Sequence, residues 1–382
     1  MDLSAFRDPK VARRLIDAIH STFPGCPIKI MEVCGTHTAS IAKSGLRTVM
    51  PEWVTLLSGP GCPVCVTANR DIDTAIALGR LDGVTITTFG DMMKVPGSSS
   101  SLSAEKADGR DIRIVYSPLD ALDLAQKDPS REVVFIAVGF ETTAPLIAAA
   151  LIRAHDSGIS NFSVFCAHKT VPGALDALVN DPDVEVDAFI LPGHVSTIIG
   201  ARPYQFLADT YRTSGVIAGF EPVDILQAIW MLVSQLEQGR AEIEIAYRRG
   251  VNADGNAHAR KLMERAFEPA DAEWRGIGVI PGSGLNISQE FSALDATKRF
   301  TVSVPRPREV KGCQCGDVLR GIVLPFECRL FSKACTPEHP VGPCMVSSEG
   351  SCAAYYRYTD LGKDGSVKTD SSKTRGGKDG NG

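Results

Sequence analysis

The stretch that decides the fold is VVFIAVGFETTAPLIAAALI, residues 133–152, which carries a single charged side chain. A membrane-spanning helix can have this length. However, Gly139, Glu141, two threonines and Pro145 interrupt the middle of the stretch, and such residues mark a turn between two shorter apolar segments. The stretch is therefore predicted to form a buried strand, a tight loop and a buried helix, which is the unit of parallel sheets.

The same alternation of short apolar segments and helices continues over about residues 28–220 and predicts an α/β fold with parallel sheets. Strands are expected at Ile28–Val33, Val54–Leu57, Val84–Thr87, Ile112–Tyr116, Val133–Val138, Ser163–Cys166 and Ala188–Leu191. A strand, a polar loop and Val-Pro-Gly occur in this order twice, within residues 89–97 and 166–173. This echo favours two similar parallel-sheet α/β domains, although ordinary strand-to-helix turns would produce the same pattern.

The chain divides into five predicted parts. An amphipathic helix over 8–23, capped by Asp8, is expected to pack on the C-terminal part of the chain. Two further helices are expected at 223–238 and about 257–267. The division is 1–25 for the N-terminal helix, 26–127 for an α/β domain with Cys34, Cys62 and Cys65, 128–222 for a second α/β domain with the GFETTAP loop, 223–362 for a helical and cysteine-rich domain, and 363–382 for a disordered tail.

Composition excludes several classes of function. The 382 residues carry 45 acidic and 40 basic side chains, a net charge of −5, so no broad basic footprint for nucleic acid is expected. The first ten residues lack the pattern of a secretory signal, and no segment is predicted to cross a membrane, which predicts a cytoplasmic protein. Neither a Walker loop nor a Gly-x-Ser-x-Gly motif occurs. Eleven cysteines in such a chain indicate metal or thiol chemistry.

The sharpest local motif is GPGCPVC, residues 59–65, on a loop that leaves an apolar strand. Two thiols at the spacing of Cys62 and Cys65 can close a small disulfide or share one metal ion. The alternative is a pair of buried cysteines in a turn.

A second cysteine motif is MEVCGTH, residues 31–37, in which Cys34 ends a strand and His37 follows closely. A thiolate beside an imidazole is a plausible nucleophile or soft-metal ligand. The alternative is a strand-end cysteine with a hydrogen-bonded histidine.

A third motif, GFETTAP at residues 139–145, presents a carboxylate and two hydroxyls at a helix N-terminus. Glu141 is a candidate for proton transfer, and ordinary capping is the alternative. His168, Lys169 and His194 occupy similar positions after strands, so a polar cleft at the strand ends is expected.

The C-terminal part contains six cysteines within forty residues: Cys313, Cys315, Cys328, Cys335, Cys344 and Cys352. Their spacing is too wide for a compact zinc ribbon, and four thiolates from a loop-rich segment suit an iron–sulfur cluster. Structural zinc is the alternative. The predicted 223–362 domain is therefore interpreted as an iron–sulfur domain.

Together these motifs resemble the HypD family of hydrogenase maturation factors. The resemblance rests on CGTH at 34–37, GPGCPVC at 59–65, GFETTAP at 139–145 and CMVSSEGSC at 344–352, in this order, and covers roughly residues 8–360. It implies two similar α/β domains and a third domain with a 4Fe-4S cluster. The implied function is a scaffold for assembly of the Fe(CN)2CO unit of nickel–iron hydrogenase, in complex with the small chaperone HypC and with cyanide from HypE.

The resemblance also implies roles for individual residues. Cys34 becomes a candidate ligand of the transient Fe(CN)2CO iron, and Cys62 and Cys65 become a redox pair near the metal. His37 and Glu141 become candidates for proton handling or for orienting the thiols. The implied cluster ligands are Cys328, Cys335 and Cys352, with the fourth left open among Cys313, Cys315 and Cys344.

Two other classes of function stay open from the sequence. One is an iron–sulfur thiol–disulfide oxidoreductase that acts on another protein. The other is a structural adaptor stabilised by zinc. These motifs do not decide whether the chain is itself an enzyme. The resemblance implies that the hydrogenase large subunit is a partner only indirectly.

Overall fold

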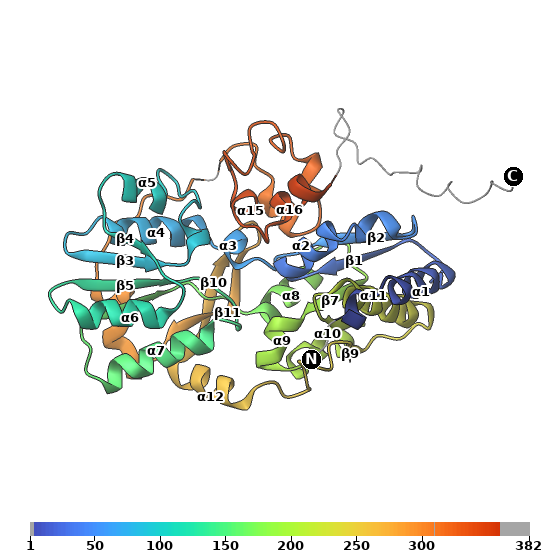
Figure 1. The fold of residues 1–382 in the computed structure, drawn as a ribbon, viewed down its shortest axis with the longest axis horizontal. Coiled ribbons are helices and arrows are strands. Elements are labelled where there is room, and N and C mark those ends of the chain that lie inside the picture. The colour runs from blue at the N-terminus through green and yellow to red at the C-terminus, as the bar shows by residue number, and fades with distance from the viewer. Residues whose placement is uncertain (1–3, 309, 360–382) are drawn as a thin grey trace, which may run out of the picture.

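A computed structural model describes residues 4–308 and 310–359, so the tail expected at 363–382 lies outside the described residues. Nine strands of this part form two sheets in which all neighbours are parallel (Figure 1). The first sheet has the order β2-β1-β7-β8-β9 and the second β4-β3-β5-β6. The strands are β1 (Ile28–Glu32), β2 (Val54–Ser58), β3 (Val84–Thr88), β4 (Ile112–Ile114), β5 (Glu132–Ala137), β6 (Phe162–Cys166), β7 (Ala188–Pro192), β8 (Ser214–Ala218) and β9 (Ile243–Ile245).

The seven strands expected from the sequence are all present, and the α/β fold class is confirmed. Both sheets begin with the same relative strand order, in which the second strand, the first, the third and the fourth lie side by side. The first sheet adds one strand, β9, at its edge. This common order agrees with two similar α/β units.

The strand pairing does not follow the division expected at 26–127 and 128–222. The second sheet is built entirely from residues between 84 and 166, and β1 pairs with β7, which lies beyond them in the sequence. The chain therefore leaves the first sheet after β2 and returns to it at β7. Each expected range contributes strands to both sheets, because a parallel partner need not be the next strand along the chain.

Helices cover both sheets. The decisive stretch at 133–152 forms β5, a turn and α7 (Ala144–Asp156), as predicted. Helix α1 (Pro9–Ser21) is capped by Asp8 and packs on α11 (Pro222–Glu237), which confirms both helices. No helix of the described residues is long and apolar enough to cross a membrane. The other α-helices of the described residues are α2 (Gly35–Lys43), α3 (Pro63–Val66), α4 (Asn69–Gly79), α5 (Leu102–Ala107), α6 (Pro118–Lys127), α8 (Val171–Val179), α9 (Gly193–Ile199), α10 (Gln205–Asp209), α12 (Ala257–Ala266), α13 (Ala296–Arg299), α14 (Cys315–Leu319), α15 (Pro343–Val346) and α16 (Ser351–Tyr358).

An antiparallel hairpin that the sequence did not predict, β10 (Phe267–Trp274) and β11 (Gly278–Ile287), stands between the two sheets (Figure 1). Its tip reaches the cysteine-rich part of the chain. Gly276 has a φ of +76°, and a Cβ there would lie 2.1 Å from the Cα of Gly316 in α14. Arg275 at the same tip donates through Nε to the carbonyl of Thr67, 2.9 Å away.

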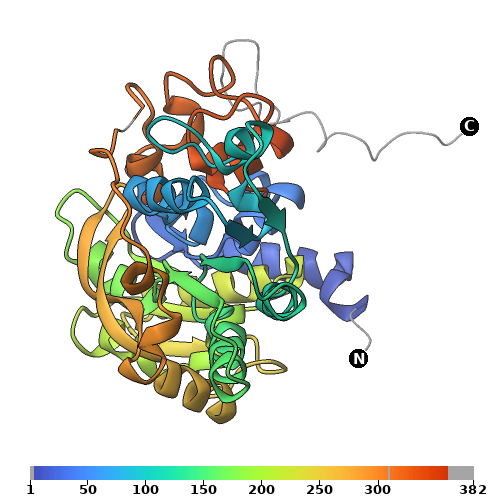
Figure 2. The same cartoon turned by 90° about the vertical axis from the view of Figure 1, so that its left-hand side faces the viewer.

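The cysteine-rich unit, residues 310–359, lies above α2 and α3 in Figure 1 and stays at the top of the molecule in Figure 2. Helix α16 packs on α2, and α15 packs on α3. One buried core continues from both sheets into this unit and includes Trp274, Leu319 and Met345. The unit is therefore part of the folded body and brings its cysteines to the ends of β1 and β2.

Candidate thiol and metal site

Cys34 lies at the end of β1, where it caps helix α2. The strand β1 separates β2 from β7, so Cys34 occupies the switch point of the first sheet, where open α/β sheets bind their ligands. The loop after β2 closes on it, because Gly35 N donates to Gly61 O at 2.9 Å. A Cβ at Gly61 would lie only 2.1 Å from Cys34 N. The glycine in GPGCPVC is thus required for this contact.

The Cys34 thiol is nearly enclosed, with 8% of the residue exposed. Burial raises the pKa of Cys34 to about 12, although the backbone N–H of His37 lowers it. The Glu349 carboxylate raises this pKa further, the Thr36 N–H lowers it, and Glu32 again raises it. Cys34 is therefore a neutral thiol at pH 7 in the metal-free chain, and a metal ion would have to replace its proton.

The side chain of His37 is not directed at this thiol. Its Nε2 donates to the carbonyl of Gly219 at 2.8 Å, and its ring stacks on Phe220 at 4.8 Å. The opposite face of Phe220 carries His194, 3.8 Å away between ring centroids. Burial lowers the pKa of His37 to about 4, against the raising effect of the Gly219 carbonyl. His37 is neutral at pH 7 and anchors the loop after β8.

Residue Glu349 of the CMVSSEGSC motif reaches the Cys34 loop. Its Oε1 accepts a hydrogen bond from Thr36 Oγ1 at 2.7 Å. A Cβ at Gly35 would lie 2.6 Å from Glu349 Cβ, so glycine permits this approach. The sequence motifs at 34–37, 59–65 and 344–352 therefore meet at one place.

Cys62 and Cys65 lie in the same turn. Cys62 caps α3, its Sγ accepts from Cys65 N at 3.3 Å, and the two residues are 3% and 0% exposed. Burial raises the pKa of Cys65 well above its ordinary value, while a hydrogen bond with Cys344 lowers it and one with Cys62 raises it. Cys65 thus touches both its motif partner and the C-terminal unit.

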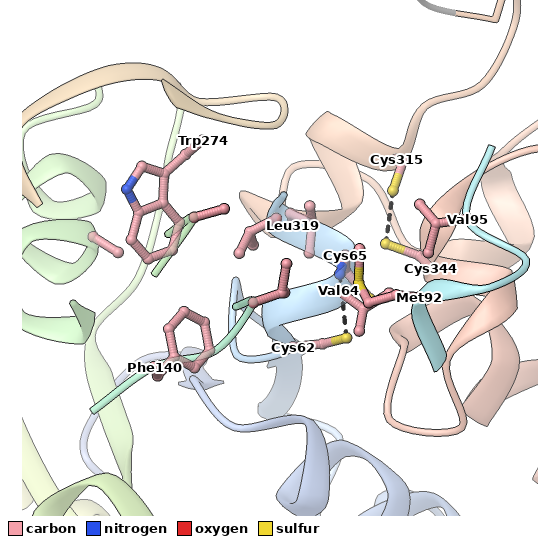
Figure 3. Close-up of a cluster of buried hydrophobic side chains, with 14 of the residues drawn as sticks. Cys62, Val64, Cys65, Met92, Val95, Phe140, Trp274, Cys315, Leu319 and Cys344 are labelled. Atoms are coloured by element: carbon pink, nitrogen blue, oxygen red, sulfur yellow. Dashed lines mark hydrogen bonds between the residues drawn. The ribbon is translucent and has the colours of Figure 1, made fainter. Parts of the chain in front are cut away.

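The thiols continue from Cys65 into the cysteine-rich unit as one line (Figure 3). Cys344 lies beside Cys65, and its Sγ is 2.6 Å from that of Cys315. Cys315 in turn shares a hydrogen bond with Cys313. The sequence did not predict the contact of Cys315 with Cys344, because 29 positions separate them.

This line predicts two reversible disulfides. Cys62 and Cys65 should interconvert between dithiol and disulfide, because their short loop closes at little entropic cost, and Cys315 and Cys344 should form a second pair. Thiol counting on denatured protein, with and without reductant, should differ by two for each oxidised pair. Cys62→Ala should remove the first difference and leave the second, and a first difference that persists in Cys62→Ala would show that another pair is responsible.

All six C-terminal cysteines line one pocket together with apolar side chains such as Leu330, Phe331 and Met345. Burial raises the pKa of Cys352 well above its ordinary value, and the thiols of Cys315 and Cys335 add to the rise. In the described ranges, no three His, Cys, Asp or Glu side chains converge closely enough to hold a single metal ion.

The thiols of this pocket accept and donate hydrogen bonds with the backbone. Val341 N donates to Cys335 Sγ at 3.3 Å, and Cys328 Sγ donates to Gly312 O at 3.9 Å. Backbone N–H groups directed at sulfur are also found around iron–sulfur clusters. The six thiols, the apolar lining and this N–H group fit such a cluster.

Glu141 lies apart from the thiols, at the N-terminus of α8. Its carboxylate accepts from Val171 N at 3.0 Å, and burial raises its pKa to about 7, against hydrogen bonds from the N–H groups of Glu141 and Val171. Tyr204 lies close enough to both Glu141 and Cys34 for each of them to affect its pKa. Burial, the Glu141 carboxylate and Cys34 raise this pKa, and the hydrogen bond with Ser196 lowers it. The structure does not bring the Glu141 side chain into contact with Cys34.

The fold and the site define an α/β protein in which a cysteine at a sheet switch point lies beside the loop from which a line of thiols leads to a cysteine-lined pocket. A family model described as HypD: Hydrogenase formation hypA family matches residues 10–359. The chain belongs to this family and has a role in hydrogenase maturation.

Three curated relatives agree with this assignment. The hydrogenase maturation factor HypD of Rhizobium leguminosarum bv. viciae is 46% identical over 93% of this chain and 95% of its own length. That of Rhodobacter capsulatus is 47% identical over 93% and 97%. That of Cupriavidus necator is 44% identical over 93% and 96%. The similarity thus extends along nearly the whole of each protein.

Proposed function

We propose that this chain is the scaffold on which the Fe(CN)2CO unit of nickel–iron hydrogenase is assembled, and that it also supplies redox chemistry. It would act in complex with a HypC-type chaperone, receive cyanide from a HypE-type protein and serve the hydrogenase large subunit indirectly. The observation that carries the proposal is the line of thiols from Cys62 through Cys65 and Cys344 to Cys315. The line begins next to Gly61, whose carbonyl bonds the Cys34 loop, and it ends in the cysteine-lined pocket. A cytoplasmic location is part of the proposal.

In this proposal Cys34 holds the iron as cargo. Low-spin iron with cyanide and carbonyl ligands favours soft thiolates, and a thiolate of the chaperone would supply a second one. The N–H groups of Thr36 and His37 act on the Cys34 sulfur and favour its charged form. They would therefore stabilise the thiolate once iron has displaced the proton.

A 4Fe-4S cluster would be held by Cys313, Cys328, Cys335 and Cys352. This choice is supported by the contact of Cys315 with Cys344, since those two thiols would form the second disulfide and four cysteines would then be left for the cluster. Thiols spread around a pocket, rather than directed at one point, favour a cluster over structural zinc. When bound, the cluster would supply single electrons to the neighbouring thiols.

The thiols would pass electrons in pairs. Thiolate attack by Cys65 on a Cys315–Cys344 disulfide would form a Cys65–Cys344 bond and release the Cys315 thiolate. Attack by Cys62 on Cys65 would then close Cys62–Cys65 and release Cys344, so that one pair is oxidised as the other is reduced. Glu141, whose pKa of about 7 suits proton exchange at neutral pH, is a proton-handling candidate. We assign His37 an orienting role.

The alternative, a thiol–disulfide oxidoreductase acting on another protein, needs an accessible thiol pair. Cys62 and Cys65 are buried at 3% and 0% exposure, so a protein disulfide cannot reach them without an opening of the loop. This burial favours the scaffold.

The infrared spectrum of the chain co-purified anaerobically with its small chaperone tests the proposal. Cyanide and carbonyl stretching bands are expected in the spectrum of the complex. The protein should also be brown and show the visible absorbance that is typical of iron–sulfur proteins. A complex that carries the cluster absorbance but no cyanide or carbonyl bands would favour the oxidoreductase. A colourless protein would favour the zinc adaptor.

A further inference from the structure

The tip of the β10–β11 hairpin stands between the two cysteine pairs that are expected to form disulfides. This hairpin tip, residues 275–277, joins the last residue of β10 to the first residue of β11. On one side it contacts the end of α3, the helix that carries Cys65. On the other side it contacts the first turn of α14, which begins at Cys315. Neither of these contacts was expected from the sequence motifs.

Hydrogen bonds fix the hairpin tip to the end of α3. Arg275 N donates to the carbonyl of Val66 at 2.9 Å, and Arg275 Nε donates to the carbonyl of Thr67 at the same distance. Trp274, the residue before the tip, also forms an antiparallel bridge with Thr67. Helix α15, which carries Cys344, packs on α3. The hairpin tip, α3 and α15 are therefore held together as one packed group.

Two glycines in close contact join this group to α14. A Cβ at Gly276 would lie 2.1 Å from the Cα of Gly316, and a Cβ at Gly316 would lie 2.7 Å from the Cα of Gly276. Backbone atoms cannot rotate out of the way as a side chain can, so any larger residue here would push α14 away. Gly316 directly follows Cys315, whose Sγ is 2.6 Å from that of Cys344. The hairpin tip thus sets how closely the Cys315 thiol approaches α15.

The other end of α14 is held by different contacts. Arg320, which follows the last residue of this helix, forms an ion pair with Asp181 at 2.8 Å and another with Asp317 at 3.0 Å. Asp181 lies in the segment between α8 and β7. A change at the hairpin tip should therefore move the first turn of α14 and leave its last turn anchored.

The base of the hairpin rests on the second sheet. Thr170, in the loop after β6, donates through its backbone N–H to the carbonyl of Ser283 in β11 at 2.8 Å. Nearer the tip, the ring of Trp274 stacks on Phe140, from the loop after β5, at 5.8 Å between centroids (Figure 3). The hairpin therefore connects the carboxyl ends of two strands of the second sheet to the first turn of α14.

We propose that the hairpin tip acts as a spacer that stabilises the Cys315–Cys344 disulfide, with Arg275 and Gly276 as its positioning residues. Arg275 fixes the tip to α3, and Gly276 lets α14 come close enough for the two sulfurs to bond. Two thiols that the fold holds together have a high effective concentration for each other, which makes their disulfide harder to reduce. The inference rests on the proposed function in taking this pair as one of two that exchange electrons.

The hairpin tip would thereby set the direction of that exchange. When the two pairs exchange, the Cys62 and Cys65 thiols lose two hydrogen atoms and close one disulfide, while the Cys315–Cys344 disulfide accepts them and opens. Cys62 and Cys65 lie within one turn of the chain, so their disulfide does not depend on the position of α14. Only one side of the equilibrium is therefore controlled by the hairpin tip.

The test is the reduction potential of each pair in the full chain, prepared anaerobically without its chaperone. The protein is equilibrated with mixtures of reduced and oxidised dithiothreitol and quenched with acid, and the linked peptides are quantified by mass spectrometry. Gly276→Ala should destabilise the Cys315–Cys344 disulfide about tenfold, because a small misplacement of reacting groups has effects of this order. For a two-electron couple, this is a rise of about 30 mV. The equilibrium constant of the Cys62–Cys65 pair should change less than about twofold.

Gly278→Ala is the matched control. Gly276 and Gly278 have φ angles of +76° and +99°, so alanine is strained at both positions, but a Cβ at Gly278 has no atom within 4 Å. Gly278→Ala should leave both potentials unchanged. Arg275→Lys is a second variant, which keeps the charge but loses the planar group that reaches the Thr67 carbonyl. It should destabilise the Cys315–Cys344 disulfide about threefold, the effect of one hydrogen bond, and it replaces Gly276→Ala if that variant does not fold.

An unchanged Cys315–Cys344 potential in Gly276→Ala, or in Arg275→Lys where the first variant does not fold, would overturn the proposal. An equal rise for both pairs, or the same rise in Gly278→Ala, would also overturn it, because either result indicates a general loosening of the fold. A wild-type chain that never forms the Cys315–Cys344 link would contradict the exchange itself, and the spacer role with it. Absence of cyanide and carbonyl bands in the infrared experiment would leave these potentials as they are.

Discussion

Cys34→Ala is expected to reduce nickel–iron hydrogenase maturation to background while the protein stays folded and keeps its cluster. The iron would lose one of its few soft ligands, and the alanine would leave the fold almost intact. Cys34 caps α2 without a side-chain hydrogen bond to it, so its removal should cost less than the ~2–5 kcal/mol of a large core truncation. Complementation of a hydrogenase-deficient strain, beside a thermal melt of the same variant, measures both effects.

Cys26→Ala is the matched control, since Cys26 is an exposed thiol outside the site. It should leave both the activity and the melting temperature unchanged. Normal hydrogenase activity in Cys34→Ala would refute the iron-ligand role. Lost activity together with a collapsed melting temperature would instead show that Cys34 is a structural cysteine.

Cys328→Ser should remove the iron–sulfur absorbance and the bound iron, expected at about four atoms per chain for a 4Fe-4S cluster. It should also lower stability more than Cys34→Ala does. Metal binding supplies folding free energy to a loop-rich unit, and the unit packs on α2 and α3 through α16 and α15. Iron analysis, the visible spectrum and a thermal melt of anaerobically prepared protein are the measurements.

Cys166→Ser provides the comparison for Cys328→Ser, because Cys166 ends β6 and does not line the cysteine pocket. It should keep full iron content and colour. If Cys328→Ser retained them as well, the assignment of Cys328 as a ligand would be wrong.

The sequence predicted the parts of the fold that have a local signal. Seven strands were recognised because each is a short apolar run between turn residues. Strands β8 and β9 flank α11 and were not predicted, and β9 is only three residues long. Strand β11 contains Pro281 and Gly282, which are typical of a loop. The insertion of the second sheet has no local signal at all, because only the pairing of β1 with β7 defines it.

The candidate site shows the same limit. The sequence motifs identified Cys34, Cys62, Cys65 and the six C-terminal cysteines as candidate site residues, because unusual residues at short spacing can be recognised in a sequence. The role of Glu349 and the pairing of Cys315 with Cys344 depend on segments that meet only in space. His37, predicted beside the thiol, instead donates to Gly219 because α2 turns its ring toward the loop after β8.

The insertion of one sheet into the other sets an order of events during synthesis. All four strands of the second sheet have been synthesised by residue 166, so this unit has every strand it needs while β1 and β2 still lack β7. A domain generally folds as its own residues emerge. The switch point at Cys34, by contrast, has both its flanking strands only after residue 192, and the cysteine pocket needs residues up to 352. A nascent chain therefore exposes Cys34, Cys62 and Cys65 long before it has a place in which to bury them.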